Sequence, residues 1–220
     1  PAAGDWPANY MIDGAIPVLA LEPLAMVYNT TLVKEPITGY QDLLRPELQG
    51  KLGTTGVQAV SIVAWYQWLE KTQGAGFLAK FAAQKPRIYT GAVPETQAAA
   101  SGEIAVAAFT VPTVAVPVIG KGAPLKLVIT KPALGIRYAG GILANSRRPN
   151  AVQVLFAYLM SPRGQAMWHD PKFGGSASPL GTAKVPGTPA PETIQPFDPS
   201  PYNANSIADY RKEWETIFKR

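Results

Sequence analysis

The sequence predicts an α/β fold with a mixed or parallel sheet. Apolar, strand-like runs alternate along the chain with segments whose apolar residues recur at helical spacing, and this alternation is typical of α/β proteins. The 220 residues are 47% hydrophobic, which is enough to bury a core in one large domain or in two small ones. We find no internal repeat.

The expected strands are short apolar runs that end in turn residues. Residues 24–28 are apolar and lead into the polar residues 29–31, as a buried strand entering a turn does. Another strand begins at 51–53, immediately after a segment that ends a helix. Further strands are expected at 104–108, 125–130 and 137–144.

The expected helices begin at recognisable capping residues or carry an apolar face. Thr38 followed by Gln41 resembles a capping box and predicts a short helix that includes Leu44. Ser161 and Pro162 predict the first turn of another helix. Further helices are expected at 60–71, from 77 to 81, from 94 to 101, and from 149 to 159.

The last part of the chain combines a proline-rich segment with an amphipathic helix. Between Pro179 and Pro201 proline recurs every few residues, which excludes a helix or a central strand there. We expect an extended arm that lies over the surface, with a disordered tail as the alternative. A helix is expected from about 206 to 218, because apolar residues recur there at helical spacing: Ile207, Tyr210, Trp214 and Phe218.

Composition excludes several classes of site. The chain has no cysteine, so it can form no disulfide and contains no thiolate metal ligand or cysteine nucleophile. Lysine and arginine outnumber acidic residues by 20 to 15, but they are scattered and form no basic stripe of the kind that binds nucleic acid. No apolar run reaches the roughly 18–20 residues that a membrane span needs. The best candidate, 105–119, is interrupted by Pro112 and Pro117.

No catalytic constellation is visible in the sequence. The one histidine, His169, lies near an expected helix end and is interpreted as a surface or capping residue. The serine-containing string 174–178 lacks the second glycine of a nucleophile elbow. No phosphate-binding or dinucleotide-binding glycine loop occurs, and the acidic residues are too sparse to suggest a two-carboxylate hydrolase. We therefore expect no catalytic residue, no cofactor and no metal site.

What remains is chemistry suited to holding a small polar solute. Thr54, Thr55 and Gly56 follow a strand and precede a helix. Hydroxyl groups and free backbone N–H groups at such a position can hold a polar or anionic ligand. Thr90 and Gly91 repeat this pattern. For both turns, an ordinary helix cap is the competing interpretation.

Several short motifs follow one another in a familiar order. They are Met-Val-Tyr-Asn-Thr at 26–30, Tyr-Gln-Asp-Leu-Leu at 40–44, Leu-Gln-Gly-Lys-Leu at 48–52, Ala-Ser-Gly-Glu at 100–103, Lys-Gly-Ala-Pro at 121–124, Asn-Ala at 150–151, and Leu-Met-Ser-Pro-Arg-Gly-Gln at 159–165. In this order and spacing the sequence resembles the bacterial extracellular solute-binding proteins, family 1, of ABC importers. The resemblance is to the branch that includes ferric-ion-binding periplasmic proteins, and it covers nearly the whole chain from about Leu19.

The resemblance implies a fold and a division of the chain. Members of the family have the periplasmic-binding-protein type II fold, in which two α/β lobes with mixed sheets are joined by crossing strands and hold the ligand between them. Most of the first lobe would precede Pro1, so one complete lobe and part of the other are expected here. The second, ligand-binding lobe with the crossing strands is expected at 19–138, the return segment of the first lobe at 139–185, and the proline-rich arm with the C-terminal helix at 186–220.

The resemblance also implies which residues contact the solute. By position, Thr55, Gly56 and Val57 correspond to an anion-holding turn, directly after Thr54. Thr90 and Gly91 lie near a second turn that contacts the ligand.

A third segment separates this chain from the ferric-ion binders. Phe109, Thr110 and Val111 lie where those proteins begin an adjacent pair of tyrosines, and no two tyrosines are adjacent in this sequence. For Phe109 and Thr110, plain core packing is the competing interpretation. Because ferric ion prefers anionic oxygen ligands, we expect an organic or oxyanionic solute rather than bare iron.

The function implied by the resemblance is capture of a small polar or anionic solute and its delivery to an ABC permease at the membrane. The protein is then expected to be exported to the periplasm or the extracellular space, to be monomeric and to bind no nucleic acid. Residues 1–10 lack the basic start and apolar core of a signal peptide, so any signal would have been removed from this chain. An enzyme or a sensory protein on the same two-lobed fold is the alternative.

Overall fold

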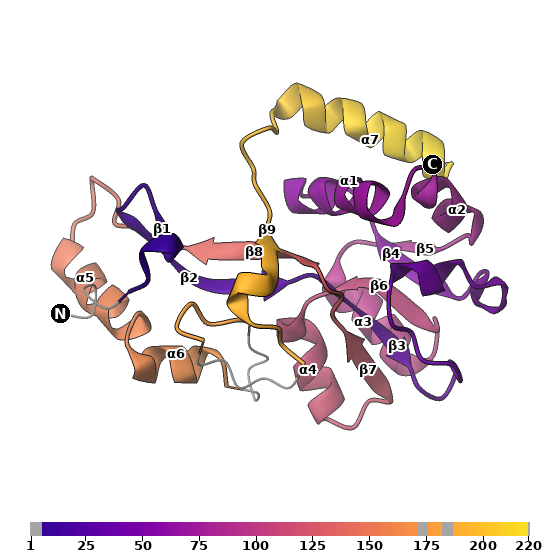
Figure 1. Cartoon of the computed structure of the whole chain (residues 1–220), viewed down its shortest axis with the longest axis horizontal. Helices are drawn as coiled ribbons and strands as arrows, with labels where there is room; N and C mark the ends of the chain where they lie inside the picture. Colours follow the sequence, from indigo (N-terminus) through magenta and orange to yellow (C-terminus); the bar gives the residue numbers. More distant parts are fainter. Residues whose placement is uncertain (1–5, 171–175, 182–186, 220) are drawn as a thin grey trace.

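Two mixed β-sheets with their helices make up the computed structural model, which describes residues 6–170, 176–181 and 187–219 (Figure 1). A five-stranded sheet has the strand order β5-β4-β6-β3-β7, and a four-stranded sheet has the order β1-β2-β8-β9. Each sheet contains both parallel and antiparallel pairs. The predicted α/β class is therefore confirmed.

The bounds of the elements are as follows. The strands are β1 (Met11–Ile12), β2 (Ile16–Pro23), β3 (Ala25–Asn29), β4 (Leu52–Thr55), β5 (Arg87–Tyr89), β6 (Val106–Thr110), β7 (Leu125–Val128), β8 (Ala133–Ala139) and β9 (Ile194–Pro196). The α-helices are α1 (Val60–Gln73), α2 (Phe77–Ala83), α3 (Ala92–Ser101), α4 (Pro112–Gly120), α5 (Pro149–Leu159), α6 (Pro162–Trp168) and α7 (Ala204–Phe218).

Two antiparallel strands connect the two sheets. β2 belongs to the small sheet and leads into β3 of the large one, and β7 of the large sheet is followed by β8 of the small one. β2 and β8 pair with each other, with Leu21 opposite Arg137 and Pro23 opposite Gly135. In Figure 1 they run between the two parts of the molecule. They are the crossing strands that the resemblance implied.

The five-stranded sheet is covered by helices on both faces. α1, α2 and α7 lie on one face, and α3 and α4 lie on the other (Figure 1). β4, β5 and β6 are parallel, so helical crossovers must join them. α1 and α2 link β4 to β5, and α3 links β5 to β6. Leu52 of β4 packs with α1 and α2, whereas Ala107 of β6 packs with α3.

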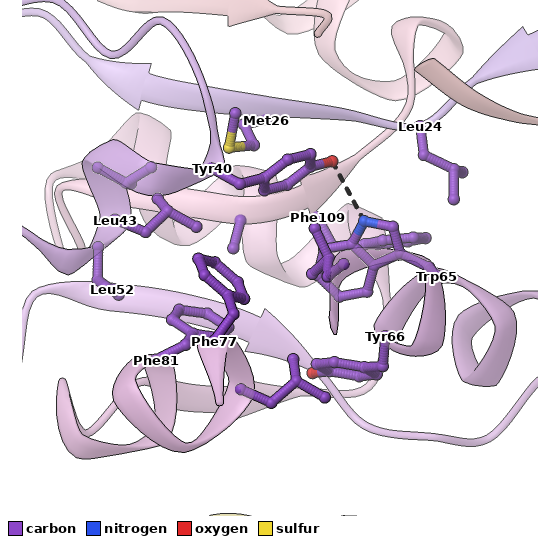
Figure 2. Close-up of a cluster of buried hydrophobic side chains, with 14 of the residues drawn as sticks. Leu24, Met26, Tyr40, Leu43, Leu52, Trp65, Tyr66, Phe77, Phe81 and Phe109 are labelled. Carbon is purple, nitrogen blue, oxygen red and sulfur yellow. Dashed lines mark hydrogen bonds between the residues drawn. The ribbon is translucent and has the colours of Figure 1, made fainter. Parts of the chain in front are cut away.

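Aromatic side chains fill the space between this sheet and α1 (Figure 2). The Trp65 Nε1–H donates a hydrogen bond to the Tyr40 hydroxyl oxygen at 3.1 Å. α7 adds Trp214 and Phe218, whose rings stack with their centroids 4.6 Å apart, and the Trp214 ring lies 5.7 Å from that of Tyr66. Trp214 is only 4% exposed. The apolar face predicted for the last helix therefore packs onto the part of the molecule built on the five-stranded sheet, which we call the large lobe.

The four-stranded sheet carries α5 and α6. Gln165 of α6 donates from Nε2 to the Leu19 carbonyl oxygen of β2 at 3.1 Å. α5 has no buried residue, and its Val154 and Leu155 are 71% and 52% exposed. This part contains the segment predicted to return to the first lobe. The predicted boundaries at 139, 185 and 186 stay predictions, and residues 171–175 and 182–186 of these segments, with the glycines of the 174–178 string, lie outside the described residues.

One helix was not predicted, because its segment contains two prolines. Pro112 is the first residue of α4, where its missing N–H removes no intrahelical hydrogen bond, and only Pro117 lies inside the helix. The run 105–119 is thus the strand β6 followed by a helix. Within the described residues, no helix is both long enough and apolar enough to cross a membrane.

Three other local predictions differ from the structure. The short helix after Thr38 is a 3-10 helix at Tyr40–Leu44, and its start is capped by Asp42 rather than Gln41, since Asp42 Oδ2 accepts from the Thr38 N–H at 2.6 Å. β8 runs over Ala133–Ala139 rather than over 137–144, because its pairing with β2 and β9 is confined to these residues. His169 is the C-cap of α6 and is 1% exposed, so the capping interpretation is right and the surface interpretation is wrong.

Candidate functional site

Three parallel strands end at one edge of the five-stranded sheet, and a helix begins after each. Thr55 at the end of β4 is in register with Tyr89 at the end of β5, and β6 runs parallel to β4. The strands lead into α1, α3 and α4 respectively. Three helix N-termini, with their partial positive charge and unpaired N–H groups, therefore gather at this edge. The residues predicted to bind ligand lie at or beside it: Thr54, Thr55, Gly56, Val57, Thr90, Gly91, Phe109, Thr110 and Val111.

The two threonines that end β4 have different environments. Thr54 Oγ1 lies 2.7 Å from the Tyr66 hydroxyl oxygen, and the Tyr66 hydroxyl donates to the Thr55 carbonyl oxygen at 2.7 Å. Since Tyr66 has a single hydroxyl proton, Thr54 must donate to Tyr66, and its side chain is committed to the core. Thr55 Oγ1 is buried as well, but it has no hydrogen-bond partner among the described residues. Successive strand residues face opposite sides of a sheet, so the Thr55 hydroxyl lies on the α3 side.

The turn at residues 56–59 separates β4 from α1. The Gly56 N–H donates to the Tyr89 carbonyl oxygen at 3.0 Å, and the Gln58 N–H donates to the Gly56 carbonyl oxygen at 3.0 Å. Ala59 is the N-cap of α1, and no side chain in the described part of the chain caps this helix. The predicted turn thus offers free donors, but they follow Gly56 rather than include it. Between Gly56 and the first turn of α1, no acceptor is found among the described residues for the N–H groups of Val57, Ala59, Val60 and Ser61.

A second helix end with free donors belongs to α3. Gly91 is its N-cap, and no described side chain caps the helix. The Glu95 N–H makes the first bond back to the Gly91 carbonyl oxygen at 3.3 Å. Thr90 is exposed, so its hydroxyl is accessible from outside, unlike that of Thr54. Over residues 6–170, 176–181 and 187–219, no acceptor is found for the N–H groups of Gly91, Ala92 and Val93.

Beneath this helix end, Glu95 and Thr96 connect α3 to the end of β6. Glu95 Oε1 accepts from the Phe109 N–H at 3.0 Å, and Oε2 has no partner among the residues that the structure describes. Burial raises the pKa of Glu95 well above its usual value, an effect that the hydrogen bond from the Phe109 N–H opposes. The hydroxyl oxygens of Thr96 and Thr110 lie 2.7 Å apart. α3 therefore holds the end of β6 in place.

Two of the predicted contact residues are mainly core residues. Phe109 is 7% exposed, and its ring centroid lies 5.1 Å from that of Trp65 (Figure 2). Val57 is 8% exposed and belongs to the same hydrophobic cluster. This geometry favours the core-packing interpretation for the Phe109 side chain. Val111 is half-buried and is the N-cap of α4.

The third helix end is occupied by an acidic side chain that the sequence reasoning missed. Glu22 of β2 is 1% exposed, and its Oε1 accepts from the Thr113 N–H at 3.2 Å and from the Thr113 hydroxyl. Its Oε2 accepts from the Tyr138 hydroxyl of β8. Three donors suit an ionised carboxylate, which only accepts hydrogen bonds. The one sequence signal was an acidic residue inside the long apolar run that becomes β2 and β3.

The three helix ends at this edge therefore differ in whether their N–H groups already have an acceptor. At α4 the positive helix end faces Glu22, whereas at α1 and α3 the helix ends remain open to an acceptor from outside. An oxygen-rich anionic or polar group would find unpaired donors between α1 and α3. We find no comparable supply of free donors at α4 within the described residues, because Pro112 has no N–H and Thr113 is bonded to Glu22.

Metal binding receives no support from this arrangement. The described residues contain no group of three or more His, Asp or Glu side chains placed to hold a metal ion. Tyr66, beside the end of β4, donates its hydroxyl proton to the Thr55 carbonyl oxygen, and burial raises its pKa above the usual value. A tyrosine in this state is a poor source of a tyrosinate ligand.

A groove of about 470 Å³ opens on the α7 side of the turn. It is lined by residues 56–58 and Ile88 and by three residues of α7: Arg211, Trp214 and Glu215. Helix α7 is therefore next to the turn that leads into α1.

Comparison with protein families and solved structures places this geometry in context. A family model described as bacterial extracellular solute-binding protein matches residues 1–172. A search of curated protein sequences gave no match. The substrate-binding protein of an ABC transporter from Agrobacterium tumefaciens has a TM-score of 0.79 and 14% identity, and the match covers 100% of this chain and 72% of that chain.

Two further structures are similar to this chain and carry ligands. Iron-bound HitA from Pseudomonas aeruginosa has a TM-score of 0.68 and 16% identity, covering 97% of this chain and 74% of that one. The periplasmic binding protein AfuA from Actinobacillus pleuropneumoniae, with fructose-6-phosphate bound, has a TM-score of 0.62 and 16% identity, covering 100% and 72%. At these identities the likeness concerns the fold. The expected periplasmic-binding-protein type II fold, with one complete lobe and part of the other, is confirmed.

Proposed function

Because the chain belongs to the bacterial extracellular solute-binding proteins, we propose that it is the solute-binding component of an ABC import system. It captures a small polar or anionic solute in the cleft between its lobes, in the periplasm or outside the cell, and delivers it to a membrane permease. Of the residues predicted to bind ligand, Thr55 and the turn after it, with Thr90 and Gly91, contact the solute where α1 and α3 begin, whereas the side chains of Thr54 and Phe109 support that edge from the core.

The single observation that carries this proposal is the pair of open helix ends at one edge. Within the described residues, α1 and α3 both present N–H groups with no acceptor and have no side-chain cap. Unpaired N–H groups at a helix N-terminus favour an anionic or oxygen-rich group. The buried Thr55 hydroxyl without a partner in the described part of the chain lies at the same place. The sugar phosphate carried by AfuA is a solute of this chemical class.

The same edge gives no support to an enzyme. Among the described residues, no side chain that could act as a base lies in contact with the hydroxyl groups of Thr55, Thr90 or Thr110 in a nucleophile–base pair. His169 lies at the end of α6, where its Nε2 is 3.2 Å from Gln165 Oε1. Burial lowers its pKa to about 4. We therefore assign no reaction to this site.

The proposal is tested by identifying the solute and then removing one donor. Native mass spectrometry of the purified protein identifies a small molecule that co-purifies with it. Val60→Pro then removes an unpaired N–H at the first residue of α1, where proline is well tolerated. The extended backbone of Ala59 is compatible with a following proline. Affinity for the identified solute should fall by about ten- to a hundredfold, since one hydrogen bond to a charged group is lost.

A matched control lies at another helix. Ala204→Pro makes the same change at the first residue of α7, which is capped by Asn203 and is not part of the edge. This variant should bind the solute like the wild type, and both variants should melt near the wild-type temperature. An unchanged affinity in folded Val60→Pro would place the solute elsewhere.

A further inference from the structure

Helix α7 holds the turn at residues 56–59 through one arginine. Arg211 donates from Nε to the Val57 carbonyl oxygen at 2.9 Å and from Nη2 to the Gln58 carbonyl oxygen at 2.8 Å. The guanidinium group thus bonds two successive carbonyl groups of a segment that lies more than 150 residues earlier in the chain. Two bonds from one planar group fix the direction of both carbonyls.

Fixing the carbonyls also fixes the N–H groups that follow them. A trans peptide is planar, so the C=O of one residue and the N–H of the next point in opposite directions. With the Val57 and Gln58 carbonyls on Arg211, the N–H groups of Gln58 and Ala59 point away from the guanidinium. The Gln58 N–H is used by the Gly56 carbonyl oxygen. The Ala59 N–H remains, and it is the first of the free donors at the start of α1.

The positive charge of Arg211 also favours hydrogen-bond donation by the Ala59 N–H. The guanidinium is always charged in proteins, and no salt bridge to it is found in the described residues. Glu215 lines the same groove one helical turn away without forming an ion pair with Arg211 in that part of the chain. A cation bonded to a carbonyl oxygen polarises the peptide and makes its N–H a stronger donor. Arg211 therefore both sets the direction of the Ala59 N–H and makes this group a stronger hydrogen-bond donor.

We propose that Arg211 is a positioning residue for solute binding: it holds the turn from behind so that the Ala59 N–H faces an anionic group at the start of α1. This inference rests on the proposed function. A separate observation points to a ligand at the same place, because Thr55 at the base of the turn has a buried hydroxyl with no partner among the residues described. Arg211 itself does not touch the solute.

The competing role for Arg211 is to fasten α7 to the lobe. α7 already has a large apolar anchorage through Trp214 and Phe218, so the two roles can be separated by comparing affinity with thermal stability. Arg211→Met keeps the aliphatic stem but removes the charge and both donors. Arg211→Lys keeps the charge and can reach one carbonyl. Lys212→Met removes a neighbouring charge whose ion-pair partner is Asp209 at 3.7 Å, and it serves as the control.

The probe is inorganic phosphate, followed by amide chemical shifts in NMR and by calorimetry at a temperature where every variant is folded. In the wild type, phosphate should shift the amide signals of Ala59 and Val60. Arg211→Met should weaken phosphate binding by about tenfold, Arg211→Lys should recover part of the loss, and Lys212→Met should bind normally. Wild-type phosphate affinity in Arg211→Met, or no phosphate-dependent shift at Ala59 and Val60 in the wild type, would overturn the inference.

Failure here can be told apart from failure of the proposed function. If native mass spectrometry finds a co-purified solute whose amide shifts map to other residues, the protein is still a solute-binding protein and only the role of Arg211 is wrong. If no small molecule binds at any position, the proposed function itself fails.

Discussion

Glu22 on β2 accepts a hydrogen bond from the Tyr138 hydroxyl on β8, so the two crossing strands are joined by their side chains as well as by their backbones. The same carboxyl group accepts from Thr113 at the start of α4. One acidic side chain, 1% exposed, therefore connects both crossing strands to a helix of the large lobe.

Replacing Glu22 by glutamine should destabilise the protein. The amide keeps the size of the side chain, but its NH₂ group cannot accept the bonds that one carboxyl oxygen now accepts. Unfolding in urea should show a loss of about 1–3 kcal/mol, because buried donors are left without an acceptor. Tyr138→Phe removes only one donor and should cost less than Glu22→Gln. Equal stability of Glu22→Gln and the wild type would mean that these three hydrogen bonds do not form in solution.

Glu95→Gln should make stability less dependent on pH. Burial raises the pKa of Glu95 in the folded state, so between the unfolded value near 4.5 and the raised folded value the folded protein binds more protons than the unfolded chain. Stability therefore falls as pH rises through this window. Glutamine stays neutral, so the variant should match the wild type near pH 4 and be more stable than it at pH 8.

Thermal melts from pH 4 to pH 8 measure this difference, with exposed Glu213→Gln as the control. The control should follow the wild type at every pH. A Glu95→Gln variant whose melting temperature changes with pH as steeply as that of the wild type would show that Glu95 is ionised in the folded protein.

Two glycines near the edge should respond differently to alanine. A Cβ at Gly53 would lie 2.5 Å from Ile104 Cδ1 and 2.9 Å from Tyr89 Cε2, inside the packed α3 face. At Gly56 the nearest atom is Nε2 of exposed Gln58, at 2.7 Å, and this flexible side chain can move. Gly53→Ala should cost about 1–3 kcal/mol by overpacking, and Gly56→Ala well under that. The free energies of unfolding of the two variants, measured in urea, test this expected order. A larger loss for Gly56→Ala than for Gly53→Ala would contradict the packing described for β4.

Ferric citrate should produce no visible charge-transfer band with this protein. Tyr66 is kept protonated by burial and bonded to the Thr55 carbonyl oxygen, and ferric ion requires anionic oxygen ligands. Visible absorption spectra before and after addition of ferric citrate make the measurement. A strong band that disappears in Tyr28→Phe or Tyr66→Phe would refute the expectation.

Local signals explain which parts of the fold the sequence predicted. Helix α1 was expected at 60–71 and is found at Val60–Gln73, because its apolar spacing is visible within the segment itself. The Ser161 cap of α6 was predicted in the same way, and its Oγ accepts from the Gly164 N–H at 3.1 Å. Turn and strand order also brought the predicted contact residues to one edge. Their role in binding stays a prediction.

The parts that were missed depend on residues distant in sequence. Glu22 has donors 91 and 116 residues away, so nothing in its own segment shows that it is satisfied. The Thr54 hydroxyl was predicted to bind ligand, yet it is hydrogen-bonded to the hydroxyl of Tyr66 on α1. The contact between Arg211 and the turn could not be inferred either, because spacing alone does not show which helix lies behind it.

The place of α7 in the chain has a consequence for biosynthesis. The aromatic surface of α1 and α2 is made early, but the helix that covers it with Trp214 and Phe218 follows only after the strands and helices of the other lobe. During translation, Tyr66 and Phe81 of the large lobe therefore stay without their α7 packing partners until α7 has been synthesised. An intermediate of this kind exposes apolar surface to aggregation and to chaperones. Conditions that slow elongation after α6 should lengthen that exposure and lower the yield of soluble protein.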